Sequence, residues 1–483
     1  MKKHSEGWLV GKGALVGGIC GLAVFSAGAY QPAAGYYVDL SDQADVGAQP
    51  VQQMAFKPSA GRGDAPVVEI KPDEILHSGL SGLGGAFNEN GGEAFMSLPK
   101  AKQKAVAAAL FNPETGAGLT LCRTAVGSSD FGLSAYSYSE TPEDYAMKYF
   151  SVERDTTSVI PFILAAQAEN PGLRIFASPW SPPGWMKVNG RMDTTDAGPK
   201  KAKNPNDPNN VLKSDPKIYE AYALYFSRYV QAYAEHGVPV ERILVQNETD
   251  MNPIYPGCNM LPEQMAELVS NHMRPRFKKD GVQAEIWAGT FRGKRGDAKT
   301  FMTLDAANDV DGVGMQYAAP AHLAYLTATY PELPLMHTEG KCWNGANSMK
   351  QARTRFGEVA MWLNGGCENY CYWNMVLNET STSGWGWKQN SLVRIDRKTG
   401  DVIYTSDFAP IALLSRFIRP GDQLLKVETP NKNPAIAVAN DERLVLFLEN
   451  NTGQPAATGI RIGDETMSVE IPAHRLCAFV FKK

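Results

Sequence analysis

Eight short β-rich runs alternate with helical stretches along this chain, and that rhythm constrains the fold more than any other feature. The runs are 82–87, 119–126, 173–178, 242–246, 285–289, 312–317, 333–338 and 369–374. Most are apolar throughout rather than alternating, which is typical of strands buried on both faces. Eight strand–helix alternations favour an α/β fold, a closed (β/α)8 or TIM barrel. A doubly wound open sheet is the alternative, although no G-x-G-x-x-G segment follows the first run.

The composition of the chain changes after residue 405. Residues 81–405 are assigned to the barrel, and residues 406–483 to a smaller antiparallel β-sandwich side domain, because short strands and turns dominate from Asp422 onward. Residues 67–80 are expected to add an N-terminal strand to this side domain. Residues 30–66 are rich in Ala, Gly, Gln, Pro and Asp without periodicity, so a linker is predicted there.

Residues 1–29 have the pattern of a secretory signal peptide. Three lysines within the first 12 residues precede an apolar run at 14–25, and an A-x-A pattern ends at Ala29. The run is too short and too rich in glycine for a spanning helix, and no other run is long enough to cross a membrane. The sequence therefore predicts export to the periplasm or the extracellular space, without stable membrane insertion.

Charge and cysteine usage exclude several classes of function. The formal net charge of -4 leaves no surplus of positive charge to neutralise phosphates, so nucleic acid is not an expected partner. Six of the seven cysteines follow residue 29, but they form no dense disulfide pattern, and their pairing stays open. Cys367 and Cys371 lack zinc-finger spacing and are predicted to be structural thiols. No metal and no organic cofactor are expected.

Two glutamates come shortly after apolar runs, at the C-terminal ends of the predicted strands. In a barrel these ends surround one opening, where the active site lies. Glu248 closes the segment Gln246-Asn247-Glu248 after the fourth run, and Glu339 closes His337-Thr338-Glu339 after the seventh. Cleavage of a glycosidic bond needs one carboxylic acid to protonate the leaving oxygen. It needs a second carboxylate to attack the anomeric carbon or to activate water. The pair is therefore the candidate catalytic centre.

Other polar and aromatic residues lie within the same runs, near their ends, or shortly after them. Arg123 and Asp130 are predicted to form an ion pair that holds sugar hydroxyls, with a structural salt bridge as the alternative. Tyr317 is a candidate hydrogen-bond donor to Glu339. The candidate sugar platforms are Trp180 and Trp373, with Trp185, Trp385 and Trp387 as weaker candidates. His337 is predicted to be a packed strand histidine.

These segments resemble glycoside hydrolase family 30, which includes glucosylceramidases and β-1,6-glucanases. The resemblance is carried by 84–89, 123–131, 177–187, 245–248, 337–339, 372–377 and 389–391. It implies that Glu248 is the acid/base, that Glu339 is the nucleophile and that Asn247 binds the 2-hydroxyl of the sugar. The residues it implies for substrate binding are Arg123, Asp130, Trp180, Tyr317 and Trp373. Asn374, which ends the eighth run beside Trp373, is a further candidate for substrate binding. The resemblance also implies a barrel with a side β-domain formed from both termini.

The sequence therefore predicts a retaining β-glycoside hydrolase that acts by double displacement on a β-linked carbohydrate. A β-glucoside is the first candidate substrate, followed by a β-1,6-glucan or a β-fucoside. The alternatives are a non-catalytic glycan-binding protein on the same scaffold, which would bind glycans without cleaving them, and a transglycosylase, whose products would be diverted by acceptor alcohols.

Overall fold

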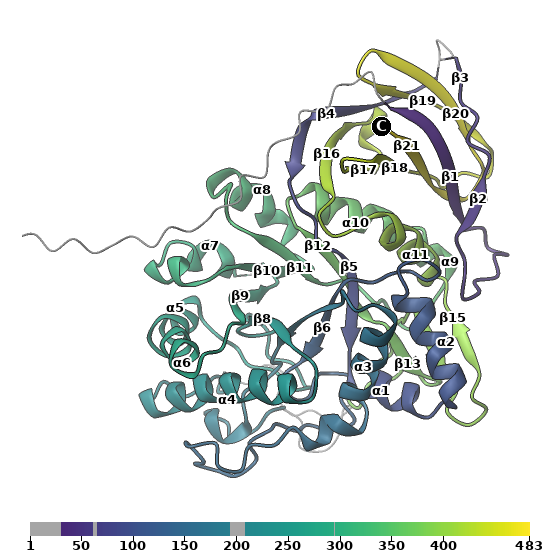
Figure 1. Ribbon diagram of the computed structural model, residues 1–483. Coiled ribbons are helices and arrows are strands. Elements are labelled where there is room, and N and C mark those ends of the chain that lie inside the picture. Colours follow the sequence, from purple (N-terminus) through teal and green to yellow (C-terminus); the bar gives the residue numbers. More distant parts are fainter. Residues whose placement is uncertain (1–29, 61–64, 194–207, 294) are drawn as a thin grey trace, which may run out of the picture.

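The computed structural model describes residues 30–60, 65–193, 208–293 and 295–483. They form a barrel surrounded by helices and, beside one end of it, a smaller β-domain (Figure 1). The predicted signal peptide, residues 1–29, lies outside the described residues. Within the described ranges, no helix combines the length and the apolar character needed to span a membrane.

Eight parallel strands form the barrel, in the order β11-β10-β9-β8-β7-β6-β5-β12. They are β5 (Gly82–Phe87), β6 (Leu121–Ala125), β7 (Arg174–Ser178), β8 (Val240–Leu244), β9 (Glu285–Phe291), β10 (Gly312–Gln316), β11 (Leu335–Glu339) and β12 (Asn369–Asn374). β11 and β12 meet through the Glu368 amide, which donates to the Leu335 carbonyl at 2.9 Å, and the Gly340 amide, which donates to the Cys371 carbonyl at 2.7 Å. Each predicted run overlaps one of these strands, and the predicted (β/α)8 fold is confirmed.

Burial on both faces explains why these strands are apolar throughout. One face of the sheet encloses a small interior cluster, made of Leu121, Phe176, Leu244, Trp287, Met336 and Cys371, and the other packs against the surrounding helices. Glycine is needed where β5 approaches β6, because a Cβ atom on Gly84 would lie 1.7 Å from the carbonyl oxygen of Leu121. The absence of a side chain at Gly84 is therefore a packing requirement of the barrel wall.

Helices follow most strands of the barrel. They are α1 (Glu89–Met96), α2 (Lys100–Phe111), α3 (Val159–Glu169), α4 (Pro216–Glu235), α5 (Pro262–Glu267), α6 (Arg274–Asp280), α7 (Asp297–Phe301), α8 (Pro320–Thr329), α9 (Met349–Ala352), α10 (Arg355–Asn364) and α11 (Phe408–Phe417). α1 and α2 are separated by residues 97–99, and Pro99 directly precedes α2. Proline has no amide hydrogen and disfavours helical geometry in the residue before it, so the chain restarts there.

The side domain is built from both ends of the described chain. Its strands are β1 (Gln31–Asp39), β2 (Gln52–Met54), β3 (Ser59–Ala60), β4 (Val67–His77), β16 (Gln423–Glu428), β17 (Ile436–Ala439), β18 (Arg443–Asn450), β19 (Ala456–Ile462), β20 (Glu465–Ile471) and β21 (Arg475–Lys482). As expected, the early strand β4 joins it, between β16 and β19. Alternate residues of its strands enter two cores: Val445 and Phe447 pack with the barrel, whereas Leu446 and Leu448 pack within the domain.

The prediction of a linker over residues 30–66 is wrong for most of that range. β1 is hydrogen-bonded to β21 along its whole length, from Gln31 opposite Lys482 to Asp39 opposite Arg475, and β2 pairs with its other edge. Residues 31–35 of this strand are small or polar and show no hydrophobic alternation, so backbone pairing with β21 sets their position. Residues 61–64 of the predicted linker lie outside the described residues.

A small third sheet extends from the barrel. β13 (Val376–Asn378), β14 (Val393–Ile395) and β15 (Val402–Tyr404) form it, and β13 begins two residues after β12 ends. The chain between β13 and β14 returns to the barrel mouth, where the amide of Leu392 donates to the carbonyl of Asn374 at 3.1 Å. This return places residues 387–389 beside the strand ends.

Candidate active site

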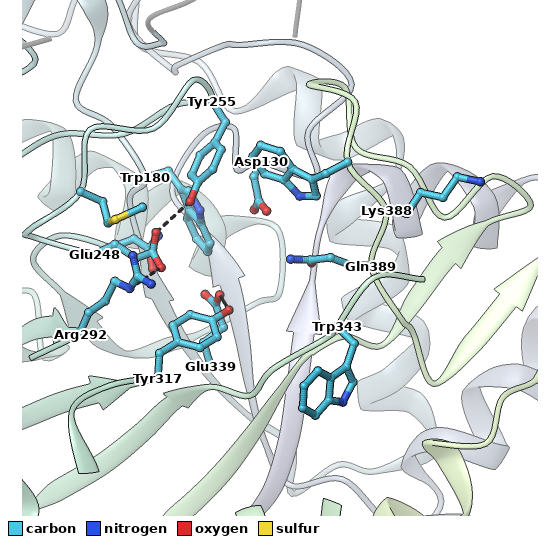
Figure 2. A pocket seen from close by; sticks show the side chains of 13 residues that line it. Asp130, Trp180, Glu248, Tyr255, Arg292, Tyr317, Glu339, Trp343, Lys388 and Gln389 are labelled. Atoms are coloured by element: carbon cyan, nitrogen blue, oxygen red, sulfur yellow. Dashed lines mark hydrogen bonds and ion pairs between the residues drawn. The ribbon is translucent and has the colours of Figure 1, made fainter. Parts of the chain in front are cut away.

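A cavity of about 370 Å³ opens at the C-terminal ends of the barrel strands. It is lined by Asp130, Trp180, Asn247, Glu248, Met251, Tyr255, Arg292, Tyr317, Glu339, Trp343, Trp387, Lys388 and Gln389. Figure 2 shows the carboxyl groups of Glu248 and Glu339 directed into the same space. Six of the nine predicted site residues thus line one cavity, and the other three, Arg123, Trp373 and Asn374, lie behind its wall.

Glu339 is the last residue of β11 and is held from two sides. Nη1 of Arg123 lies 2.6 Å from its Oε2 atom, and the hydroxyl of Tyr317 donates to its Oε1 atom. Burial, and then the charge of Glu339, raise the pKa of Tyr317 well above its usual value, so this phenol stays a donor. Both oxygens of Glu339 therefore accept hydrogen bonds, as suits a carboxylate, which only accepts.

Arg123 is fully buried and organises the floor of the site. Its Nε and Nη2 atoms donate to Oγ of Ser178 at 3.1 and 2.7 Å, and Nη2 also donates to Oδ1 of Asn247 at 2.8 Å. The predicted ion pair between Arg123 and Asp130 is wrong, since the ion pair of Arg123 in the described structure is with Glu339. The guanidinium of Arg123 donates to Ser178, Asn247 and Glu339. Asp130 therefore does not pair with it and lines the cavity instead.

Glu248 follows β8 and has a different environment. The hydroxyl of Tyr255 donates to its Oε2 atom at 2.9 Å, and Nε of Arg292 lies 3.2 Å from its Oε1 atom. Burial raises the pKa of Glu248 to about 6; Arg292 acts in the opposite direction, and Glu339 adds to the rise. Glu248 adopts a φ of 49°, a left-handed conformation that is uncommon outside glycine and is found at functional sites.

The two glutamates therefore face one cavity in distinct electrostatic surroundings. Glu339 is bonded to a buried guanidinium and a phenol, whereas burial makes Glu248 a weaker acid than an exposed glutamic acid. Such a difference between two neighbouring carboxyl groups allows one to stay ionised while the other carries a proton. Chemically, the pair can supply a nucleophile and a proton donor to the same bond.

Asp130 and Asn247 present polar groups to the cavity. Burial, and then Glu339 and Glu248, raise the pKa of Asp130 well above its usual value. Its Oδ1 atom is buried and has no hydrogen-bond partner within the described residues. The Oδ1 atom of Asn247 accepts from Arg123 at 2.8 Å and from Thr290 at 3.2 Å, so its NH2 group is the part left for a ligand.

The predicted aromatic platforms occupy two layers. Trp180 lines the cavity, and Trp373 is buried behind it, with ring centroids 4.9 Å apart at an angle of 27°. The guanidinium of Arg123 lies 4.4 Å from the Trp180 ring centroid. Asn374 is also behind the wall, where its Nδ2 atom donates to Oε1 of Gln389 at 2.7 Å. Trp373 and Asn374 thus position residues of the cavity.

Several cavity residues were not identified from the sequence. Arg292 directly follows β9, which runs two residues beyond its predicted end, so a polar residue after the fifth strand was an available signal. Tyr255 comes from an irregular loop without periodicity. Gln389 falls in the 389–391 segment that carries the family resemblance, and Trp387, a weaker platform candidate, does line the cavity.

His337 and the six described cysteines are structural. The His337 ring stacks on Tyr370 at 4.5 Å between centroids, burial lowers its pKa well below the usual value, and it is a packed strand histidine as predicted. All six cysteines are buried free thiols. The described residues contain no group of three or more His, Cys, Asp or Glu side chains that could hold a metal ion.

Comparison with known proteins identifies the family. The model described as "Glycosyl hydrolase family 30 TIM-barrel domain" matches residues 80–412. The chain belongs to glycosyl hydrolase family 30. Within the family, a putative glucosylceramidase of Caenorhabditis elegans is 26% identical over 365 residues, covering 71% of this chain and 67% of the relative. An endo-1,6-β-D-glucanase of Neurospora crassa is 26% identical over 361 residues, covering 71% of each.

Solved structures of the same fold cover nearly the whole chain. The crystal structure of SrfJ from Salmonella typhimurium matches with a TM-score of 0.83 at 22% identity, covering 93% of this chain and 99% of that one. A structure titled as an endo-β1,6-glucanase matches with a TM-score of 0.80 at 21% identity and the same coverage. At these identities the likeness shows a shared fold. Because it belongs to family 30, the protein is classified as a glycoside hydrolase.

Proposed function

We propose that this chain is a retaining β-glycoside hydrolase in which Glu339 is the nucleophile and Glu248 the acid/base. The observation that carries the proposal is the pair of glutamates facing one cavity in unlike surroundings. Arg123 lies 2.6 Å from Glu339, and burial raises the pKa of Glu248 to about 6. A retaining mechanism needs this division of roles between two carboxyl groups.

In the first step, a carboxylate oxygen of Glu339 attacks the anomeric carbon and forms a covalent glycosyl ester. The bond between that carbon and the leaving oxygen breaks, and protonated Glu248 gives its proton to the leaving oxygen. Trp180 would support the sugar ring, while Asp130 and the NH2 group of Asn247 would bind its hydroxyls.

In the second step, water takes the place of the departed group. Glu248, now a carboxylate, removes a proton from the water as its oxygen attacks the anomeric carbon, and Glu339 leaves as a carboxylate. Arg292 and Tyr255, which contact Glu248, favour its charged form and so support its role as a base. The two displacements together keep the β configuration.

We propose a β-glucoside as the substrate, with β-1,6-linked glucan as the leading polymer. Relatives from Trichoderma harzianum and Neurospora crassa are named endo-1,6-β-D-glucanases, and the former is 30% identical over 260 residues, about half of each chain. Other relatives are named glucosylceramidases, after a glucosylated lipid. A polymeric substrate agrees with the export predicted from residues 1–29.

The roles are tested with Glu339→Gln and Glu248→Gln, assayed on activated aryl β-glucosides and β-1,6-gluco-oligosaccharides. Glu339→Gln should abolish turnover. Glu248→Gln should still react with a good leaving group, and azide should restore its second step and yield a β-glycosyl azide. The matched control is Glu332→Gln, an exposed glutamate before β11. Near-normal rates in Glu339→Gln, or an α-anomer as the first product seen by NMR, would overturn the proposal.

A further inference from the structure

Trp343 lines the cavity but has no part in the two steps above. Its side chain is large and apolar, yet it is 42% exposed to solvent. Its backbone is left-handed, with a φ of 41°, which is an outlier for a bulky residue and costs conformational energy. Exposure and backbone strain together at the rim of a substrate cavity indicate a contact that is completed by a ligand.

The loop that carries Trp343 is fixed to its neighbours. The amide of Asn390 donates to the carbonyl of Cys342 at 2.6 Å, and the amide of Asn347 donates to Oδ1 of Asn390 at 3.1 Å. The amide of Ser391 in turn donates to Oδ1 of Asn347 at 3.1 Å. These bonds join the loop after β11 to the segment that carries Gln389. The indole is therefore held at the rim before any ligand arrives, which lowers the entropy cost of binding.

Gln389 is presented beside Trp343 in a defined orientation. Its Oε1 atom accepts from Nδ2 of Asn374 at 2.7 Å, so its NH2 group is left for the cavity. In Figure 2, Trp343 and Gln389 lie together on the side of the cavity opposite Glu248 and Arg292. An indole face next to an amide donor suits a sugar, because C–H groups of the ring pack on the indole while a hydroxyl accepts from the amide.

We propose that Trp343 and Gln389 form a second sugar subsite, which binds the ring next to the one held between the two glutamates. The substrate is then a β-linked oligosaccharide or polysaccharide. An acyl chain is disfavoured because Gln389, which lies beside Trp343 in Figure 2, and Lys388 put polar groups into the cavity lining, whereas a lipid tail needs continuous apolar surface. The identity of the neighbouring ring rests on the proposed function.

The kinetic test compares Trp343→Ala and Trp343→Phe with the parent on two substrates. β-Glucosyl fluoride occupies only the site between the glutamates, whereas β-1,6-linked gluco-oligosaccharides of two to five units extend beyond it. Trp343→Ala should lower kcat/KM on the oligosaccharides about 30-fold, the size expected for removing a central aromatic contact. It should leave the rate on the fluoride unchanged, and Trp343→Phe should recover part of the loss.

The matched control is Tyr149→Ala, an aromatic residue that is 58% exposed and is not part of the cavity lining described above. Thermal unfolding of each variant verifies that it is folded. An equal loss on both substrates, or no loss on either, would overturn the subsite. So would a loss confined to a glucosylceramide presented in vesicles.

A binding experiment separates this inference from the catalytic proposal. Oligosaccharide binding is titrated calorimetrically to Glu339→Gln with and without Trp343→Ala. Weaker binding in the double variant supports the subsite even when the parent protein cleaves nothing, in which case only the proposed function fails. Equal binding by the two proteins overturns the subsite and leaves the proposed function in place.

Discussion

Arg123 and Glu339 form a buried ion pair, with 2.6 Å between Nη1 and Oε2, and the arginine side chain has no exposed surface. Removing two charges from water is costly unless each is paired and further hydrogen-bonded. The remaining donors of Arg123 meet this requirement at Ser178 and Asn247. One cation therefore orients both the proposed nucleophile and the amide proposed to bind the neighbouring hydroxyl.

Arg123→Lys should keep a positive charge but lose most of this geometry. An ammonium cannot reproduce the planar fork that reaches Ser178, Asn247 and Glu339 together. We expect kcat to fall roughly 10²- to 10³-fold, the size seen when a preorganised electrostatic contact is removed. Steady-state kinetics on an aryl β-glucoside measure this. Arg174→Lys, in a half-exposed ion pair with Glu241, is the control. Unchanged kcat in Arg123→Lys would show that the fork is dispensable.

The pH dependence of the reaction should report on Glu248. As the acid, Glu248 must be protonated, so kcat/KM on a substrate with a poor leaving group should decline as pH rises above about 6, the value to which burial raises its pKa. Arg292 lowers that pKa. Arg292→Gln should therefore move the alkaline limb of the profile to higher pH, because removal of the positive charge favours the protonated form.

Two further measurements test whether the alkaline limb reports the protonation of Glu248. Tyr255→Phe should move the limb in the same direction, since it removes a hydrogen bond to the charged form. A substrate whose leaving group needs no proton should show little change in either variant. A limb that stays in place or moves to lower pH in Arg292→Gln would contradict the role given to Arg292.

The barrel could be predicted from the sequence because burial on both faces produces continuous apolar runs. Each of the eight runs matched a strand, and polar residues at their ends located Glu248 and Glu339. β1 was missed because residues 31–35 show no apolar alternation, and only its end, with Tyr36 and Val38 on the barrel core and Tyr37 on the side-domain core, carries a strand pattern. Pro99 did carry a signal, and the division between α1 and α2 follows from it.

The site was predictable to the extent that its residues end strands. Asp130, Trp180, Asn247 and Tyr317 were found by their position at or after the ends of such runs, and all four line the cavity. The predicted partner of Arg123, Asp130, was wrong. Ser178, Asn247 and Glu339 bind the Arg123 guanidinium instead, and the sequence does not show which polar groups lie nearest to it. Tyr255 comes from an irregular loop, whose path is set by tertiary contacts, so periodicity could not place it.

Asp407 is predicted to be a major contributor to stability. Its side chain has no exposed surface; it accepts from the hydroxyl of Tyr372 and from Nδ2 of Asn390, each at 2.9 Å, and lies 3.4 Å from the buried guanidinium of Arg355. Asp407→Ala would leave the cation with Glu358 as its remaining carboxylate partner. It would also remove the acceptor of two buried donors, so it should lower the free energy of unfolding by about 3–5 kcal/mol. Urea denaturation measures the change.

The control for this experiment is Asp441→Ala, an exposed aspartate in the turn before β18. Its effect should stay within about 0.5 kcal/mol, as for most surface substitutions. Because Asn390 also anchors the loop that carries Trp343, Asp407→Ala should weaken oligosaccharide turnover more than turnover of β-glucosyl fluoride. A cost below about 1 kcal/mol would mean that Arg355 is adequately compensated by its other partners.

The role of the N-terminal strand is tested by shortening the chain. Deleting residues 1–60 removes β1, β2 and β3, whereas deleting residues 1–29 leaves them in place. β1 covers the edge of β21, and Phe56 packs on Phe479 and Phe481 with ring centroids 5.1 and 5.2 Å apart. Loss of β1 and Phe56 would expose the unpaired edge of β21 and the rings of Phe479 and Phe481.

The shorter chain should therefore unfold at lower temperature and self-associate in size-exclusion chromatography, while the chain that begins at residue 30 stays monodisperse. Any fraction that stays folded should retain its kcat on small aryl glycosides, because these strands belong to the side domain and the cavity lies at the strand ends of the barrel. A true linker would give equal thermal midpoints for the two chains. That outcome would mean that the hydrogen bonds between β1 and β21 contribute little to the stability of the side domain.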